Sequence, residues 1–298
     1  MSSSVQVLAD KNLIQPPKWL PLNVHYETIM GSVAYGVSSD TSDMDVYGFC
    51  IPPKEIIFPH LAGEIQDFGR QKKRFEEFQQ HRVVYGDKTY DLLIYSIVKY
   101  FSLCMENNPN MIDSLFTPDS CVLHISSVGL MVREQRQLFL HKGAWHKFKG
   151  YAYSQIHKLK NKNPAGKRLE LVEKYGYDTK FAYHTVRLLN EIEMILSEGT
   201  LDLQRNREQL KSIRRGDWSE QAVLDYFSQK ELSLEGLYQS SKLRHGPDEE
   251  AIKALLLNCL EHHYGSLDKC VVKVGVAESY LNEITAVVDR WRNTGRST

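Results

Sequence analysis

The chain has 298 residues, enough for one large domain or two modest ones, and its 42% hydrophobic content suffices for a buried core. The 37 Lys and Arg balance the 37 Asp and Glu, so net charge indicates no general attraction to nucleic acid or membrane. No apolar stretch reaches the roughly 20 residues of a bilayer span, and no CxxC pair is present. The first residues lack a basic start followed by an apolar run, so we expect no signal peptide. We therefore expect a cytoplasmic protein without a disulfide framework or zinc ribbon.

The first third of the chain is predicted to alternate short strands and turns. Residues 25–32 form a short apolar segment that ends in Gly-Ser. Residues 43–50 alternate apolar and polar side chains, which predicts a strand with its two aspartates on one face. Residues 82–96 contain two β-type runs on either side of Gly86-Asp87, which predicts a hairpin.

From about residue 94 onward the apolar period is that of helices. Six helical segments are predicted, within residues 95–109, 126–140, 149–161, 179–199, 249–265 and 277–291. The fourth has a clear stop at Gly199. We therefore expect an α+β fold, with a small mixed sheet and helices up to about residue 120 and a mainly helical part after it.

Two aspartates, Asp43 and Asp45, are separated by one residue on a predicted strand, so both point to the same face. Around a divalent cation such like charges become ligands, because Mg²⁺ takes one or two carboxylates with phosphate oxygens and water. Gly31-Ser32 precedes Asp43 by ten residues, and glycine turns with exposed N–H groups favour phosphate. This predicts a triphosphate at Gly31 and Ser32 that Mg²⁺ links to both aspartates. The alternative is a polar loop followed by an edge strand with two solvated aspartates.

The segment "MGS", ten residues and "DMDV" is similar to the hG[GS]…Dh[DE]h signature of the DNA polymerase β-like nucleotidyltransferase superfamily. Within it, "GSVAYGVSSDTSDMDVYGF" resembles bacterial and phage nucleotidyltransferases with GS-x-AYG…SDxDxxG, some of them linked to RNA repair. The similarity extends over most of residues 25–205. It implies a nucleotidyltransferase core in residues 1–120 and a helical substrate-binding domain in residues 121–298. One departure is Val33, where many relatives have a basic residue.

The resemblance also implies a third acidic residue on a neighbouring strand, which completes the catalytic metal site. Asp91 is the candidate because aromatic and apolar residues flank it on a predicted strand. Asp67 is the alternative. Asp87 and Asp40 are interpreted as turn or capping residues.

A basic helix face is predicted within residues 179–199. Lys180, His184 and Arg187 have i, i+4 and i+7 spacing, which places them on one face. Their similarity to the family's K-x-x-x-H-x-x-R pattern implies nucleotide contacts, with Arg187 gripping phosphate bidentately and Lys180 acting as a point charge. His184 could instead pack or hydrogen-bond, and the whole face could simply be solvated.

A tract of basic and aromatic residues covers positions 135–169. It contains nine Lys or Arg and no Asp or Glu, and Trp145, Phe148, Tyr151 and Tyr153 are interleaved with them. Phosphate contacts and base stacking would suit a nucleic acid strand. The alternative is an amphipathic helix with aromatics in the core and lysines in solvent. A second metal site at His262-His263 is not expected, since adjacent helical side chains point apart.

Together these observations predict a nucleotidyltransferase that uses Mg²⁺ or Mn²⁺. It would move a nucleoside monophosphate from an NTP, ATP or CTP, to a hydroxyl acceptor and release pyrophosphate. RNA, as tRNA or a broken RNA end, ranks first among the acceptors, and no membrane partner is expected. Two alternatives stay open: a protein AMP transferase of a toxin–antitoxin or phage-defence system, and a catalytically silent nucleotide- or RNA-binding protein.

Overall fold

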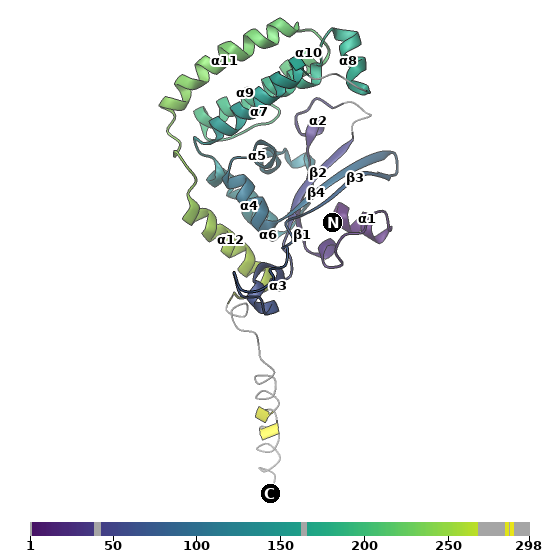
Figure 1. The fold of residues 1–298 in the computed structure, drawn as a ribbon, viewed down its shortest axis with the longest axis vertical. Coiled ribbons are helices and arrows are strands. Elements are labelled where there is room, and N and C mark those ends of the chain that lie inside the picture. Colours follow the sequence, from purple (N-terminus) through teal and green to yellow (C-terminus); the bar gives the residue numbers. More distant parts are fainter. Residues whose placement is uncertain (1, 39–42, 162–165, 268–283, 286, 289–298) are drawn as a thin grey trace. The chain divides into compact units, whose positions relative to one another are not determined.

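The computed structural model describes residues 2–38, 43–161, 166–267, 284–285 and 287–288. The chain divides into two units. The first consists of Met1–Ile51 and Glu76–Cys259, and the second of Pro52–Phe75 and Leu260–Thr298. The first unit contains the sheet and most of the helices (Figure 1), and it is the unit in which the candidate site lies.

A five-stranded mixed sheet with the order β3-β4-β2-β1-β5 forms one layer of the first unit. Its strands are β1 (Val24–Ile29), β2 (Met44–Cys50), β3 (Glu77–Tyr85), β4 (Lys88–Ser96) and β5 (Val122–Ile125). Strands β2 and β4 pair in parallel, and every other pair is antiparallel. The small mixed sheet and the hairpin of residues 82–96 are thus confirmed, with Gly86 at φ +65° in the β3–β4 turn.

Strands β2 and β4 each have one buried face and one half-buried face. Val46, Leu92 and Ile94 are fully buried, as the alternation in the sequence predicts. Helix α4 (Ile97–Met105), which directly follows β4, packs on β2 and β4. The opposite face of the same strands carries Asp45 and Asp91, which are only half-buried.

Helices make up most of the remaining first unit. They are α1 (Ser4–Asp10), α2 (Gly31–Ala34), α4 (Ile97–Met105), α5 (Pro109–Phe116), α6 (Ser127–Glu134), α7 (Ala144–Asn161), α8 (Lys167–Tyr175), α9 (Thr179–Glu198), α10 (Arg207–Arg214), α11 (Glu220–Ser240) and α12 (Glu249–Tyr264), which runs into the second unit. Short 3₁₀ turns cover Leu20–Leu22, Asp119–Cys121 and Arg136–Phe139. None of the helices in the described residues combines the length and apolar composition needed to cross a membrane.

Helix α9 is the centre of the helical layer, and α7, α8, α10 and α11 all pack against it (Figure 1). The side chain of Asp178 caps its first turn by accepting hydrogen bonds from the amides of Lys180 and Phe181. Gly199 ends it in the left-handed conformation, which confirms the predicted stop. This helix is therefore fixed at both ends and along most of its surface.

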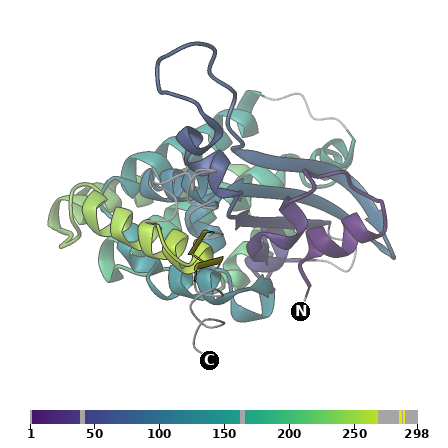
Figure 2. The same ribbon diagram turned by 90° about the horizontal axis from the view of Figure 1, so that it is seen from below.

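The amino-terminal helix α1 lies beside the sheet (Figures 1 and 2). Its first amides, those of Ser4 and Val5, donate to the carboxylate of Glu27 on β1 at 2.5 and 3.1 Å. Burial raises the pKa of Glu27 although these hydrogen bonds oppose the shift. The carboxylate is used to dock α1 and is not available to a substrate.

The second unit is small in its described part. It contains α3 (Lys54–Ile57), the 3₁₀ turn Pro59–Ala62 and the end of α12, where the ring of Phe58 lies edge-on to that of Tyr264 at 6.3 Å. Most of the helix predicted within residues 277–291 lies outside the described residues.

The helical segments predicted before residue 270 are confirmed, but α1, α5, α8, α10 and α11 were not predicted. The predicted division at residue 120 falls just before β5, which pairs with β1. A strand of the sheet therefore comes from the part assigned to the helical domain, and the division itself stays a prediction.

Candidate functional site

Two carboxylates from neighbouring strands lie directly opposite each other. Asp45 on β2 is in register with Asp91 on β4, and in a parallel pair both side chains leave the same face of the sheet. Burial, followed by the negative charge of Asp91, raises the pKa of Asp45. The pair thus holds electrostatic repulsion that a bound cation would relieve.

A bulge in β3 orients Asp91. The register of β3 and β4 shifts between Gln80 and Val83, and Arg82 adopts φ +55° there. The amide of Arg82 donates to Asp91 Oδ1 at 2.7 Å, and His81 Nδ1 lies 3.5 Å from the same oxygen. One carboxylate oxygen of Asp91 is therefore held by the neighbouring strand, which fixes the direction of the other.

The turn after β1 places Gly31 against the carboxylate of Asp45. Gly31 has φ +66°, and a Cβ built on it would lie 2.4 Å from Asp45 Oδ2, so a side chain at this position would displace that carboxylate. The amide of Met30 donates to the carbonyl of Asp45 at 2.6 Å, and the amide of Val37 donates to the carbonyl of Ser32 at 2.9 Å. The structure thus brings Gly31-Ser32 and Asp45 together.

The other acidic candidates are placed differently. Asp43 is exposed just before β2, and its charge contributes to the raised pKa of Asp45. Asp67 is exposed in a turn of the second unit at φ +61°. Asp40 lies outside the described residues. Among the described residues no group of three or more His, Cys, Asp or Glu side chains is assembled to hold a metal. Among the acidic candidates, Asp45 and Asp91 are therefore the two that the sheet places opposite each other.

The positive charge of Lys180, at the start of α9, acts electrostatically on the carboxylate of Asp45 and favours its ionised form. Desolvation, followed by the charge of Arg168, lowers the pKa of Lys180. The negative charge of Asp45 opposes this shift without cancelling it. This brings a cation from the helical layer toward the aspartates of the sheet. A substrate between them would contact positive charge from one side and carboxylates from the other.

Two further cations lie near Lys180, one on α8 and one on α10, which are two of the helices that pack against α9. Arg168 on α8 pairs with Asp178 at 2.9 Å and lies 3.9 Å from the centre of the Phe181 ring. Arg214 on α10 donates to the carbonyl of Val37, close to the Gly-Ser turn. Arg168 belongs to the predicted basic tract, whereas Arg214 was not among the predicted site residues. Its contact with Val37 joins parts of the chain that are 177 positions apart, so no local pattern indicates it.

His184 is one turn beyond Lys180, and its ring stacks on Tyr183 at 4.2 Å. Burial and surrounding cations lower its pKa well below the usual value, so the imidazole is neutral near pH 7. The cations are Arg187, Lys180, Arg168 and Arg214. A neutral His184 suits packing or hydrogen bonding better than a direct charge on phosphate.

Arg187 is buried, with 3% of its side chain exposed. Its Nη1 donates to Asp113 Oδ2 at 2.5 Å and to Glu191 Oε1 at 2.7 Å. The guanidinium is therefore engaged by two carboxylates inside the protein. This placement argues against the bidentate phosphate contact predicted for Arg187 and favours a structural role.

The basic and aromatic tract is mostly used in packing. Trp145 and Phe148 are buried in α7. Lys149 pairs with Glu231 of α11 at 2.7 Å, and the hydroxyl of Tyr153 donates to the same carboxylate. These contacts match the amphipathic-helix alternative over this part of α7. Lys162 lies outside the described residues, and RNA binding by the tract stays a prediction.

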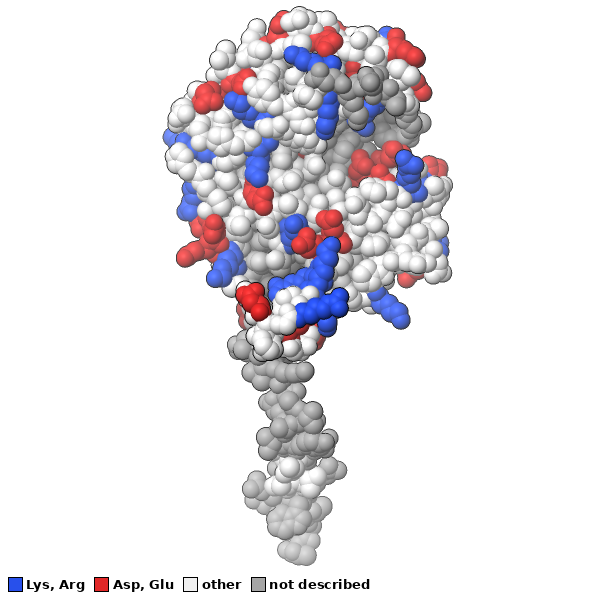
Figure 3. Space-filling model, in the orientation of Figure 1, with Lys and Arg blue, Asp and Glu red and all other residues white. Residues whose placement is uncertain are grey.

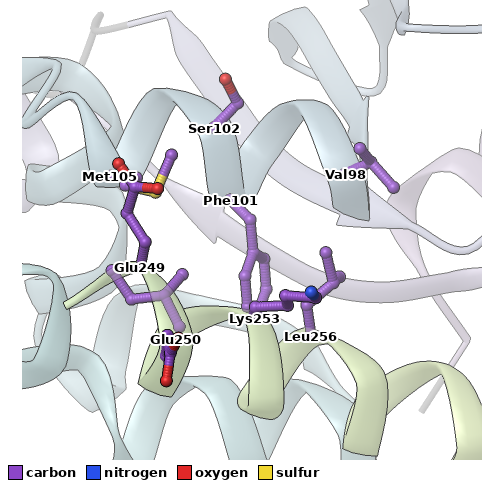
Figure 4. A pocket seen from close by; sticks show the side chains of 9 residues that line it. Val98, Phe101, Ser102, Met105, Glu249, Glu250, Lys253 and Leu256 are labelled. Atoms are coloured by element: carbon purple, nitrogen blue, oxygen red, sulfur yellow. The ribbon is translucent and has the colours of Figure 1, made fainter. Parts of the chain in front are cut away.

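In Figure 3 Asp and Glu side chains gather over the ends of β2–β4 with Lys or Arg beside them, and the helices above carry charges of both signs. A separate groove between α4 and α12 is lined largely by apolar side chains (Figure 4), among them Val98, Phe101, Met105 and Leu256. Its charged residues are Glu249, Glu250 and Lys253 of α12, and it contains none of the predicted site residues.

Comparison with known proteins gives a family match over most of the chain. The profile of the RNA repair pathway DNA polymerase beta family matches residues 6–231. No curated protein matches the sequence. Among solved structures, the crystal structure of a nucleotidyltransferase-like protein from Exiguobacterium sibiricum 255-15 aligns with 80% of this chain and 74% of its own, at 9% identity and a TM-score of 0.29.

Proposed function

Because the chain belongs to the RNA repair pathway DNA polymerase beta family, we propose that it is a Mg²⁺-dependent nucleotidyltransferase acting on RNA. The observation that carries the proposal is the in-register pair Asp45 and Asp91, which lies beside the Gly31 turn and interacts with Lys180. The family supports polymerase β-like nucleotidyl transfer and RNA repair. The metal, the NTP and the acceptor are our inferences from the residues.

The donor set fits Mg²⁺ or Mn²⁺. Asp45 and Asp91 supply oxygens from one face, with Asp43 nearby as a third carboxylate, and hard cations of this kind bind few carboxylates together with phosphate. When bound, the metal would neutralise triphosphate charge and lower the pKa of the acceptor hydroxyl. Burial and then the charge of Asp91 raise the pKa of Asp45, and a bound cation would oppose both effects.

The remaining roles belong to the chain itself. Gly31 and Ser32 form the turn that would hold the triphosphate, and Lys180 would meet its charge from the helical side. The acceptor hydroxyl oxygen forms a bond to the α-phosphorus while the bond from that phosphorus to pyrophosphate breaks. Asp91, with one oxygen held by Arg82, would accept the hydroxyl proton. Position and electrostatic field supply most of the catalysis in such reactions.

RNA is the proposed acceptor because the matched family is named for an RNA repair pathway. ATP and CTP are the proposed donors, and the cytoplasm is the proposed location. Two hypotheses compete with this one. The acceptor could be a protein, or the chain could bind nucleotide or RNA without catalytic activity. The paired carboxylates favour catalysis, since binding alone has no need to place two like charges together.

Label transfer tests the proposal. The protein is incubated with α-labelled ATP or CTP and Mg²⁺ or Mn²⁺, together with tRNA, RNA with broken ends, or lysate protein. Label on RNA supports the proposal, and label on protein alone supports the AMP transferase. Retained NTP binding without any transfer would reject the enzymatic function.

A further inference from the structure

Four buried side chains that the proposed chemistry does not use form one connected cluster: Tyr35, Asp113, Arg187 and Glu191. The Tyr35 hydroxyl donates to Asp113 Oδ2 at 2.8 Å, and Arg187 Nη1 donates to the same oxygen at 2.5 Å. Arg187 also reaches both oxygens of Glu191, at 2.7 and 2.8 Å. Its guanidinium lies 4.2 Å from the centre of the Tyr35 ring, so Tyr35 contacts the cation twice, by stacking and through Asp113.

Stability alone does not account for this cluster. Buried ion pairs are often no more stable than apolar residues of the same volume, because desolvation offsets the attraction. In the described part of the chain, Asp113 Oδ1 and Arg187 Nε also make no hydrogen bond, which adds to that cost. What the cluster does provide is directional contacts between fixed elements.

One end of the cluster is attached to the Gly31-Ser32 turn. Tyr35 follows α2 directly, and its amide donates to the carbonyl of Gly31 at 3.3 Å. The next two amides, those of Gly36 and Val37, donate to the carbonyls of Val33 and Ser32 at 3.0 and 2.9 Å. Anchoring the Tyr35 side chain therefore restrains the backbone that forms the turn.

The other end is attached to α9. Arg187 and Glu191 are one turn apart on this helix, which also carries Lys180 two turns before Arg187. Asp113 comes from α5 and joins the two ends. The cluster thus connects the turn to the helix that brings a cation toward Asp45.

We infer that Tyr35, Asp113, Arg187 and Glu191 are positioning residues. They fix the position of the Gly31-Ser32 turn relative to Lys180 on α9. The effect on substrate rests on the proposed function, because the turn and Lys180 are then the two contacts of the triphosphate. Arg187 serves that site through Tyr35 and Asp113 and does not touch the nucleotide.

The substitution Tyr35→Phe tests the inference because it removes one hydroxyl and keeps the ring on Arg187. The matched control is Tyr100→Phe. Tyr100 is also fully buried, and its hydroxyl bonds to Ser114 Oγ at 2.6 Å, on helices α4 and α5. Both changes delete one buried tyrosine hydroxyl, but only Tyr35 is attached to the turn.

Two readouts are used on the full chain. Hydrogen exchange of the amides at positions 35–37 is expected to accelerate about tenfold in Tyr35→Phe and to stay unchanged in Tyr100→Phe, as loss of one hydrogen bond to a carboxylate predicts. The KM for NTP is expected to rise about tenfold in Tyr35→Phe alone, with a smaller change in kcat.

Unchanged exchange at positions 35–37 in Tyr35→Phe would overturn the inference, and so would an equal acceleration in Tyr100→Phe. Faster exchange in Tyr35→Phe with an unchanged KM would show that the cluster restrains the turn but does not position substrate, and would overturn the inference as stated. Faster exchange in Tyr35→Phe together with no nucleotide transfer by the wild-type protein would support the positioning of the turn and reject the proposed function.

Discussion

Replacing Gly31 with alanine places a methyl group where the carboxylate of Asp45 lies. The Cβ would be 2.4 Å from Asp45 Oδ2, so the two atoms must separate by about 1 Å to reach an ordinary contact distance. The φ of +66° adds about 1–2 kcal/mol of backbone strain for any residue with a Cβ. Because a misplacement of about 1 Å in a catalytic site can cost about 100-fold in rate, we expect Gly31→Ala to lower kcat by about that factor.

Gly86→Ala separates the two effects. Gly86 has φ +65°, nearly the same as Gly31, but no atom lies within 4 Å of a Cβ built there. Both variants should lose about 1–2 kcal/mol in urea unfolding, since both force a Cβ into the left-handed region. Only Gly31→Ala should lose nucleotide transfer, measured with α-labelled NTP. Equal kcat in the two variants would refute the assignment of Asp45 and its glycine turn to the site.

Three further predictions follow from the site. Asp91→Asn should lower kcat about 100-fold or more, as loss of a proton acceptor does, whereas Asp67→Asn should keep wild-type kcat; the reverse result would exchange the two assignments. Lys180→Gln should raise the KM for NTP about tenfold in steady-state kinetics, since one cation–phosphate contact is lost, and an unchanged KM would place the triphosphate elsewhere. His184 has a lowered folded-state pKa, so the unfolded chain binds more protons once the pH falls below about 6.5. The free energy of unfolding should therefore fall as the pH drops below about 6.5, by at most about 1.4 kcal/mol per pH unit for this one group. Denaturation at pH 7 and pH 5 should show this loss in the wild type and not in His184→Gln, and equal losses would contradict it.

The local elements could be read from the sequence because their signals are local. The alternation in residues 43–50 gave β2, Gly86 marked the β3–β4 turn, and the helical period up to Gly199 gave α9. The Gly-Ser turn and the Asp-x-Asp strand also led to the family. These features depend on neighbours within a few positions, so no tertiary information was needed.

The surroundings of α9 could not be read in this way. The i, i+4, i+7 spacing places Arg187 on the same face as Lys180, but the sequence does not reveal that this face enters the core two turns later. Helices α8, α10 and α11 cover α9, and none of the three was predicted. Arg187 therefore meets Asp113, 74 positions away in the chain, where a phosphate was expected.

Long-range contacts also explain why much of the basic tract packs against other helices. Its aromatics looked suited to stacking bases, but Trp145 and Phe148 are core residues of α7. Lys149 pairs with Glu231 on α11, a helix that was not predicted. Arg214, in contrast, reaches the carbonyl of Val37 across 177 positions, a contact that no local pattern encodes.

The position of the label within the nucleotide tests the central claim most directly. The protein is given the same RNA acceptor with NTP labelled at either the α- or the γ-phosphate, beside an Asp45→Asn variant. Nucleotidyl transfer predicts that the α-label joins the RNA and that the γ-label leaves in pyrophosphate. The Asp45→Asn variant should neither label the RNA nor release pyrophosphate. Transfer of the γ-label to the acceptor, or full α-label transfer by Asp45→Asn, would contradict the account.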